Sequence, residues 1–226
     1  MTMDEDRKQL LLKMYDQMFN DINTHIMVVW QSVAVLIGAF AVFALTEKKV
    51  VTLDVAVSLI LLLCGWLIAH LYDAAYWYNR NLAIIANIEK QFLGKQDLRE
   101  IHYYFGTHRP QNKMITHLRI QYALGVGVAS IVLLFHFLTS VWPLSMSFHD
   151  FRLARSLPYG LLLVEVLYLY ELATRCERKY EEFIQNSPGS TIDTSEISYG
   201  EGHGFSVRSV KKVSRTLRSF LSLLSG

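Results

Sequence analysis

Four apolar segments that contain no Lys or Arg limit the kind of fold this chain can adopt. They cover residues 26–45, 55–71, 120–138 and 157–173. Each is close to the length at which an α-helix crosses the roughly 30 Å hydrocarbon core of a bilayer. The sequence therefore predicts an all-α polytopic membrane protein with four transmembrane helices.

Positive charge is distributed unevenly between the connections of these segments. Of the 22 Lys and Arg residues, 18 lie before the first segment, between the second and third, or after the fourth, and four lie in the two other connections. Because Lys and Arg accumulate on the cytoplasmic side of a membrane, both termini are expected in the cytoplasm. The net charge of +2 gives no indication of direct nucleic-acid binding.

Helical periodicity continues beyond the apolar segments on the cytoplasmic side, where no Gly or Pro interrupts it before Gly94 and Pro188. In chain order we expect an amphipathic cytoplasmic helix at 1–25, a transmembrane hairpin at 26–71, a cytoplasmic helical extension and loop at 72–119, a second hairpin at 120–173, a cytoplasmic helix at 174–185, a flexible linker at 186–205 and a basic amphipathic helix at 206–226.

The polar face of the expected C-terminal helix is exclusively basic, since no acidic residue follows Glu201. Its cationic residues are Arg208, Lys211, Lys212, Arg215 and Arg218. Such a helix is typical of attachment to an anionic membrane surface, where each charge contributes about 1 kcal/mol. Packing against the intracellular helices or a neighbouring subunit is the alternative.

Glu165 lies in the middle of segment 157–173, with eight residues on either side of it. A charge at this depth costs a few kcal/mol, and no Lys or Arg of any span is available to pair with it. Two roles are open: a protonated Glu165 that joins helices by hydrogen bonds, or a carboxyl group that lines a pore or ion pathway formed by several subunits.

Histidines in the apolar segments do not predict a shared metal site. His70 ends the second segment near the inner face, whereas His136 lies near the outer end of the third, roughly 20 Å away in depth. His70 could instead meet Glu171 near the inner face, either as a polar interfacial contact or as part of a pathway, so we count His70 and Glu171 with Glu165 as candidate pathway residues.

An aromatic and polar stretch begins where the second segment leaves the membrane. Tyr76, Trp77, Arg80 and Asn81 fit either the interfacial belt of a membrane protein or a site for a ligand or a partner surface. The second reading requires the rings and Arg80 to face the intracellular helices rather than lipid headgroups.

Enzyme motifs are missing from the sequence, which has no HExxH, Walker loop, GxSxG, paired CxxC or glycine-rich dinucleotide turn. We therefore expect a protein that is not an enzyme, with no catalytic residues, no metal site and no cofactor.

The stretch from Tyr76 to Asn81, leading into Ile88, Glu89 and Lys90, together with few short spans and helical cytoplasmic extensions, resembles the small membrane effectors of bacterial antiphage defence, of the SLATT type or associated with CRISPR systems. The resemblance covers about residues 26–92, and the chain departs from it by having four expected spans rather than two. It implies a homo-oligomer that opens or perturbs the bacterial inner membrane on a signal from a nucleotide second messenger or a cytoplasmic sensor protein.

Two other functions compete with such an effector. An ion-coupled transporter subunit or membrane scaffold would use Glu165 as a proton site, although four spans are few without oligomerisation. An integral-membrane enzyme would need polar groups that converge at one depth, and the histidines do not.

Overall fold

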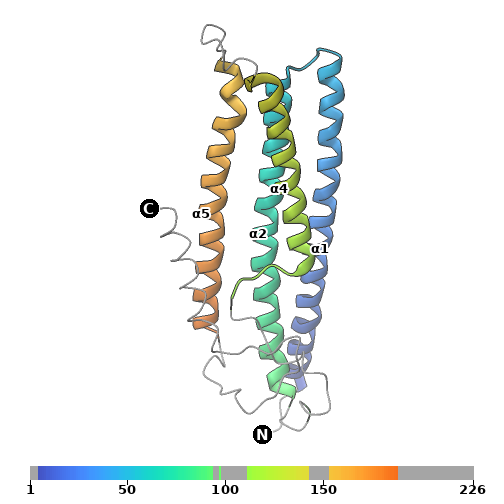
Figure 1. Ribbon diagram of the computed structural model, residues 1–226. Coiled ribbons are helices and arrows are strands. Elements are labelled where there is room, and N and C mark those ends of the chain that lie inside the picture. Colours follow the sequence, from blue (N-terminus) through green and yellow to red (C-terminus); the bar gives the residue numbers. More distant parts are fainter. Residues whose placement is uncertain (1–4, 94–96, 98–110, 143–152, 188–226) are drawn as a thin grey trace, which may run out of the picture.

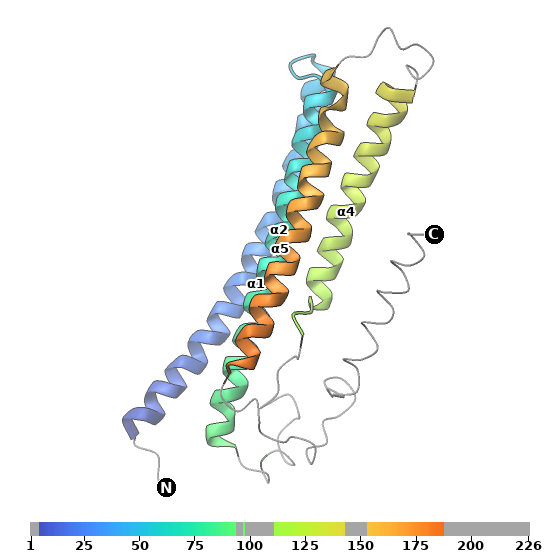
Figure 2. The same ribbon diagram turned by 90° about the vertical axis from the view of Figure 1, so that its left-hand side faces the viewer.

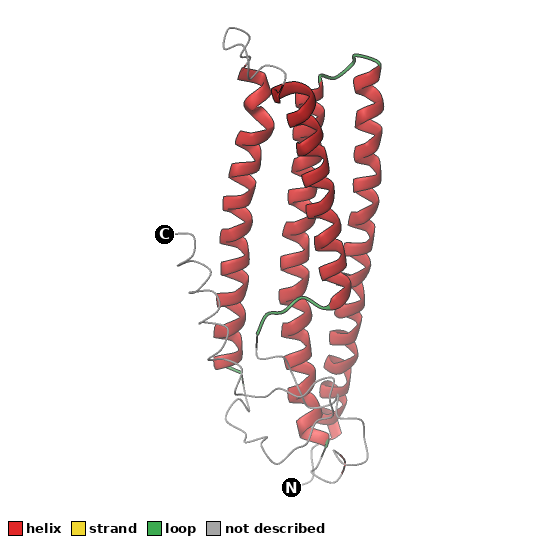
Figure 3. Cartoon of the chain, in the orientation of Figure 1, coloured by secondary structure: helices red, strands yellow, loops and turns green. Residues whose placement is uncertain are grey.

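The computed structural model describes residues 5–93, 97, 111–142 and 153–187, and the regular elements in these ranges are all helical (Figure 1, Figure 3). This confirms the all-α prediction. The elements are α1 (Glu5–Glu47), α2 (Leu53–Phe92), α4 (Thr116–His136), the π-helix η1 (Phe137–Val141), the 3-10 helix η4 (Leu153–Ser156) and α5 (Leu157–Gln185).

The helices form an elongated bundle (Figure 1). We call the end at which α1 begins and α2 and α5 finish the lower end, and the opposite end the upper end. A short turn joins α1 to α2 at the upper end, with Lys49 in the left-handed conformation (φ 57°) and the hydroxyl of Thr52 accepting a hydrogen bond from the backbone N–H of Val55. The Thr52 side chain thus caps the first turn of α2.

Helix α2 is the centre of the bundle, because α1, α4 and α5 each pack along it. Figure 1 shows α5 beside α2, and the view turned by 90° in Figure 2 shows α4 beside α2 on an adjacent side. Many of the buried positions of α2 carry a small side chain, which lets a neighbouring backbone approach closely. These positions are Ala56, Ala74, Ala75, Ala83 and Ala86.

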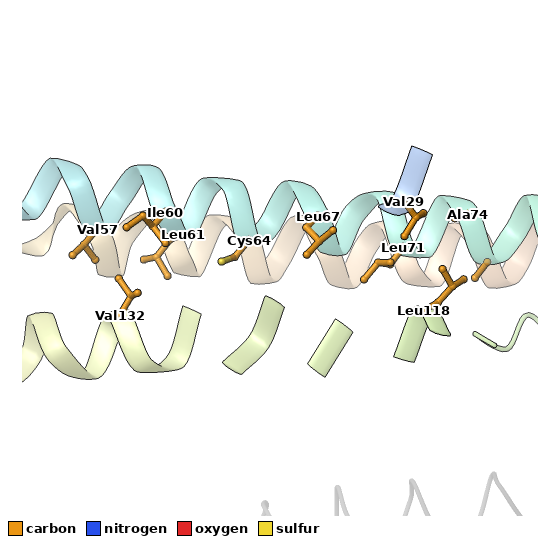
Figure 4. Close-up of a cluster of buried hydrophobic side chains, with 11 residues drawn as sticks. Val29, Val57, Ile60, Leu61, Cys64, Leu67, Leu71, Ala74, Leu118 and Val132 are labelled. Atoms are coloured by element: carbon orange, nitrogen blue, oxygen red, sulfur yellow. The ribbon is translucent and has the colours of Figure 1, made fainter. Parts of the chain in front are cut away.

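Two apolar clusters hold the helices together. The upper cluster sets residues of α2 against Val29 of α1 and against Leu118 and Val132 of α4 (Figure 4). The lower cluster packs Ile22 of α1 against Leu82 and Ile85 of α2, which continues the bundle towards the lower end. Both clusters bury apolar surface on α2.

Among the described residues, three helices are long and apolar enough to cross a membrane: Leu53–Phe92, Thr116–Val141 and Ala154–Gln185. The chain is thus compatible with a multi-pass membrane protein. The first expected span, residues 26–45, is continuous helix within α1, and the arrangement with four spans stays a prediction. The C-terminal amphipathic helix at 206–226, with all five of its basic residues, lies outside the described residues, as does most of the linker at 186–205.

Candidate functional site: a polar seam along α2

Glu165 of α5 points at the backbone of α2. A methyl group added at Gly65 would lie 2.9 Å from Cδ of Glu165 and 3.0 and 3.2 Å from its two carboxyl oxygens. Such distances are shorter than ordinary van der Waals contacts, so the carboxyl group occupies the space that any other side chain at position 65 would need. Glycine at this position is what allows the carboxyl group to reach the surface of α2.

One oxygen of the Glu165 carboxyl group is not satisfied by the contacts of the described residues. The side chain is half-buried, and Oε1 is buried without a hydrogen-bond partner among the residues that the structure describes. A buried polar atom without a partner costs about 1–3 kcal/mol. Within one chain, the described contacts therefore do not form the interhelical hydrogen bond of the first expected role.

Glu165 is not an isolated polar group. Gly65 lies on a face of α2 along which residues with polar contacts recur every two or three turns. Asp54, Gly65, Tyr72 and Asn79 follow one another at intervals of 11, 7 and 7 residues, which a helix with 3.6 residues per turn places on one side. This side faces the space between α4 and α5. We call this line of contacts the polar seam.

Each level of the polar seam contacts a polar or aromatic group of another element. Asp54 is hydrogen-bonded to His136 of α4, and the Glu165 carboxyl group lies against Gly65. Tyr72 lies edge-on to Tyr122 of α4, with ring centroids 6.2 Å apart. Asn79, which is 0% exposed, donates its side-chain N–H groups to Asn112 Oδ1 at 2.9 Å and to the carbonyl oxygen of Lys113 at 3.0 Å. The seam thus extends from the upper end past the middle of α5 to the start of α4.

The upper end of the seam contains a cluster that the sequence analysis did not predict. His136 is 0% exposed; its Nε2 lies 2.8 Å from Asp54 Oδ1 and its Nδ1 lies 3.0 Å from the hydroxyl oxygen of Tyr159. The cluster joins α2, α4 and α5. A buried histidine near the end of an apolar segment was the available signal, but neither partner is close to it in the sequence.

The expected contact between His70 and Glu171 is not formed. The His70 ring packs edge-on against Trp66 of the same helix, with centroids 4.4 Å apart. Glu171 accepts a hydrogen bond from Arg175, one turn further along α5. The described contacts therefore leave Glu165 as the one expected pathway residue on the seam.

The aromatic stretch after the second apolar segment faces other helices. The Arg80 guanidinium carbon lies 4.8 Å from the ring centre of Trp77 and 5.6 Å from that of Phe183 on α5. The Trp77 ring also stacks on His25 of α1 at 5.7 Å. Asn81 is buried, and both polar atoms of its side chain lack a partner among the described residues. Trp77 and Arg80 thus contact α1 and α5, and the ligand or interface site stays a prediction.

A cavity of about 640 Å³ lies beside this stretch, between the lower parts of α1, α2 and α5. Its size is within the range of small-molecule sites. Arg7 and Lys179 contribute positive charge, Glu182 contributes negative charge, and Tyr76 and Phe183 contribute rings. Arg7 also donates a hydrogen bond to Gln91 Oε1 at 3.3 Å across the cavity wall. Tyr76 is the residue of the expected ligand site that lines this cavity.

Comparisons of the chain with protein-family models, curated proteins and solved structures gave no match. In the part of the chain that the structure describes, no group of three or more His, Cys, Asp or Glu side chains could hold a metal ion. The geometry of the polar seam is therefore the basis of the functional argument.

Proposed function

We propose that this chain is a polytopic membrane effector that lets ions cross the bilayer along the polar seam, past Glu165. The observation that carries the proposal is the half-buried Glu165 carboxyl group, set against Gly65 with its buried Oε1 lacking a hydrogen bond among the described residues. Ionisable groups inside membranes are costly and typically mark ion or proton pathways. The other polar levels of the seam support the same reading.

Assembly into a homo-oligomer is part of this proposal. The faces of α4 and α5 that point away from α2 are large and apolar, with Ile131 69% and Leu163 62% exposed. In a membrane such faces contact lipid or copies of the same chain. A seam between two loosely joined helices can widen when neighbouring copies pull α4 or α5 away from α2, and this would admit water to Glu165.

The proposed topology has four spans, with residues 26–45 of α1 as the first, and both termini in the cytoplasm of a bacterial cell. The count of Lys and Arg by side supports this orientation in the inner membrane. The lower end of the bundle is then cytoplasmic, and the basic C-terminal segment can attach to anionic lipid of the inner leaflet.

We propose that the activating signal acts at the cavity between the lower parts of α1, α2 and α5. Arg7 and Lys179 can attract an anionic group while Tyr76 and Phe183 can stack on a planar ring, which suits a nucleotide second messenger. A cytoplasmic sensor protein that covers the same surface is the alternative partner. Either would bind three helices at once and so alter their relative positions. Antiphage defence is the setting in which such an effector would act.

A second function, a proton site in an ion-coupled transporter subunit or scaffold, is favoured by one observation. Glu165 is in contact with α2, so the conformation described here leaves no wide lumen at this level. A single carboxyl group that alternates between protonated and ionised forms needs no such lumen.

Membrane potential separates the two functions. Expression of the chain in bacterial cells, followed with a potential-sensitive dye, should collapse the potential if the chain is a depolarising effector. The control for overexpression is the Glu165→Leu variant, expressed to the same amount in the membrane. An unchanged potential with the activated wild-type chain would contradict the effector and favour the transporter or scaffold.

A further inference from the structure

The cluster at the upper end of the seam holds one histidine ring in a single orientation. Asp54 Oδ1 lies 2.8 Å from one ring nitrogen of His136, and the hydroxyl group of Tyr159 lies 3.0 Å from the other. The ring is completely buried, whereas the Asp54 side chain is 19% exposed. Because each partner comes from a different helix, the His136 ring can keep both bonds only while α2, α4 and α5 stay together.

The two distances are compatible with a neutral or with a protonated ring. In the neutral ring, Nε2–H donates to the Asp54 carboxylate and Nδ1 accepts from the Tyr159 hydroxyl group. In the protonated ring, both nitrogens donate, and the Tyr159 oxygen accepts. Both forms therefore satisfy the two ring nitrogens of His136.

The surroundings of His136 indicate why this position matters. Helices α4 and α5 each pack mainly on α2, and the bond between His136 and Tyr159 is a direct link from α4 to α5. Immediately after His136 the chain changes to the π-helix η1, a feature that often occurs at functional sites. Arg155 of η4 then donates to the carbonyl oxygen of Ser140 at 3.4 Å.

We infer that Asp54, His136 and Tyr159 form a clamp that keeps α4 and α5 together at the upper end of the polar seam. The clamp closes the outer end of the pathway that leads past Glu165. Separation of α4 from α5 would remove a hydrogen bond from at least one ring nitrogen in a buried position, which opposes opening. The assignment of the clamp as a gate rests on the proposed function, but its effect on helix separation does not.

The test measures the distance between α4 and α5 directly. Spin labels at Leu134→Cys and Leu163→Cys, both exposed positions, report this distance by pulsed electron paramagnetic resonance in the full chain, with Cys64 and Cys176 replaced by Ala. The test variants are His136→Leu and Tyr159→Phe. Tyr170→Phe is the matched control, because Tyr170 is on the same helix and 74% exposed.

Loss of one net hydrogen bond should raise the population with separated helices about two- to tenfold in Tyr159→Phe, and His136→Leu should raise it further. The double variant His136→Leu/Tyr159→Phe should show the same population of separated helices as His136→Leu alone, because the leucine has already removed the partner of Tyr159. Tyr170→Phe should match the parent. Identical distance distributions for the parent, Tyr159→Phe and His136→Leu would overturn the clamp. Since this distance does not depend on ion flux, a chain that conducts no ions would overturn the proposed function and leave the clamp standing.

Discussion

The carboxyl group of Glu165 on α5 fills the space over Gly65 on α2 that a larger residue would occupy. A Cβ atom at position 65 would lie 2.9 Å from the carboxyl carbon. The two residues are 100 positions apart in the sequence, yet the carboxyl group at position 165 leaves no room for a side chain at position 65. A helix without a side chain at this point is what allows an acidic group to lie deep between α2 and α5.

Replacing Gly65 with Ala should therefore displace the Glu165 side chain without unfolding the bundle. The atoms that meet the new methyl group are the flexible end of Glu165, and Ala is about 1 kcal/mol more favourable than Gly in a helix. We expect a thermal midpoint close to that of the parent and an ion flux reduced several-fold. Gly127→Ala on α4 is the control, since no atom lies within 4 Å of its added carbon. Equal fluxes in the two variants would argue against any role for the carboxyl position.

Asn79 should contribute strongly to stability at the lower end of the seam. It is fully buried, and its side chain holds both Asn112 and the carbonyl oxygen of Lys113. Asn79→Ala leaves those acceptors without this donor and should cost about 1–3 kcal/mol. Thermal unfolding in detergent measures the change, and the exposed Asn23→Ala should stay within about 0.5 kcal/mol of the parent. If Asn79→Ala lowered the thermal stability no more than Asn23→Ala does, the segment with Asn112 and Lys113 would be held in place by other contacts.

Tyr15 links α1 to α2 near the lower end by donating to Glu89 Oε1 at 3.0 Å. Burial, followed by the hydrogen bond and the charge of Glu89, raises the pKa of Tyr15 from 10.0 to about 12. A pKa that is raised on folding stabilises the fold below pH 10.0, and this contribution is lost as the pH rises through about 12. The thermal midpoint of the parent should therefore fall more steeply between these values than that of Tyr15→Phe. A constant difference between the two midpoints would contradict the bond.

Reporter fusions test the proposed topology. Fusions at Lys49 and Arg152 should be active outside the inner membrane, and fusions at Lys95 and Gly226 should be active in the cytoplasm, because 18 of 22 basic residues lie on the side expected to be cytoplasmic. A cytoplasmic signal from the fusion at Lys49 would remove residues 26–45 from the set of spans.

The sequence was sufficient to predict the helices that the structure describes, and it shows Glu165 as an acidic residue in the middle of an apolar segment. Apolar length and periodicity depend on neighbours along one helix, so an acidic residue in the middle of an apolar segment is visible without any structure. The same information does not contain the rotation of α2 relative to α5, which depends on how many side chains pack together. Gly65 was therefore not recognised as the residue under Glu165.

The clamp at the upper end could not be predicted for a related reason. Asp54 and His136 are 82 positions apart, and Asp54 falls at the end of a short connection where an acidic residue is ordinary. The depths of His136 and His70 in their segments exclude a shared ion, but depth does not identify the partners of His136 on other helices. The contacts of Trp77 with α1 and of Arg80 with α5 likewise depend on how the helices pack, which the sequence of a single helix does not reveal.

The central claim, that ions cross past the Glu165 carboxyl group, is tested most directly by comparing Glu165→Gln with Glu165→Leu. Glutamine keeps the shape and hydrogen-bonding capacity of the side chain but cannot ionise, whereas leucine loses both properties. Membrane potential and oligomer size should be measured for both variants and the parent after activation. We predict that Glu165→Gln assembles like the parent but fails to depolarise the membrane or changes its ion selectivity. Full depolarisation by Glu165→Gln, with assembly lost only in Glu165→Leu, would contradict the claim and make Glu165 a structural link between helices.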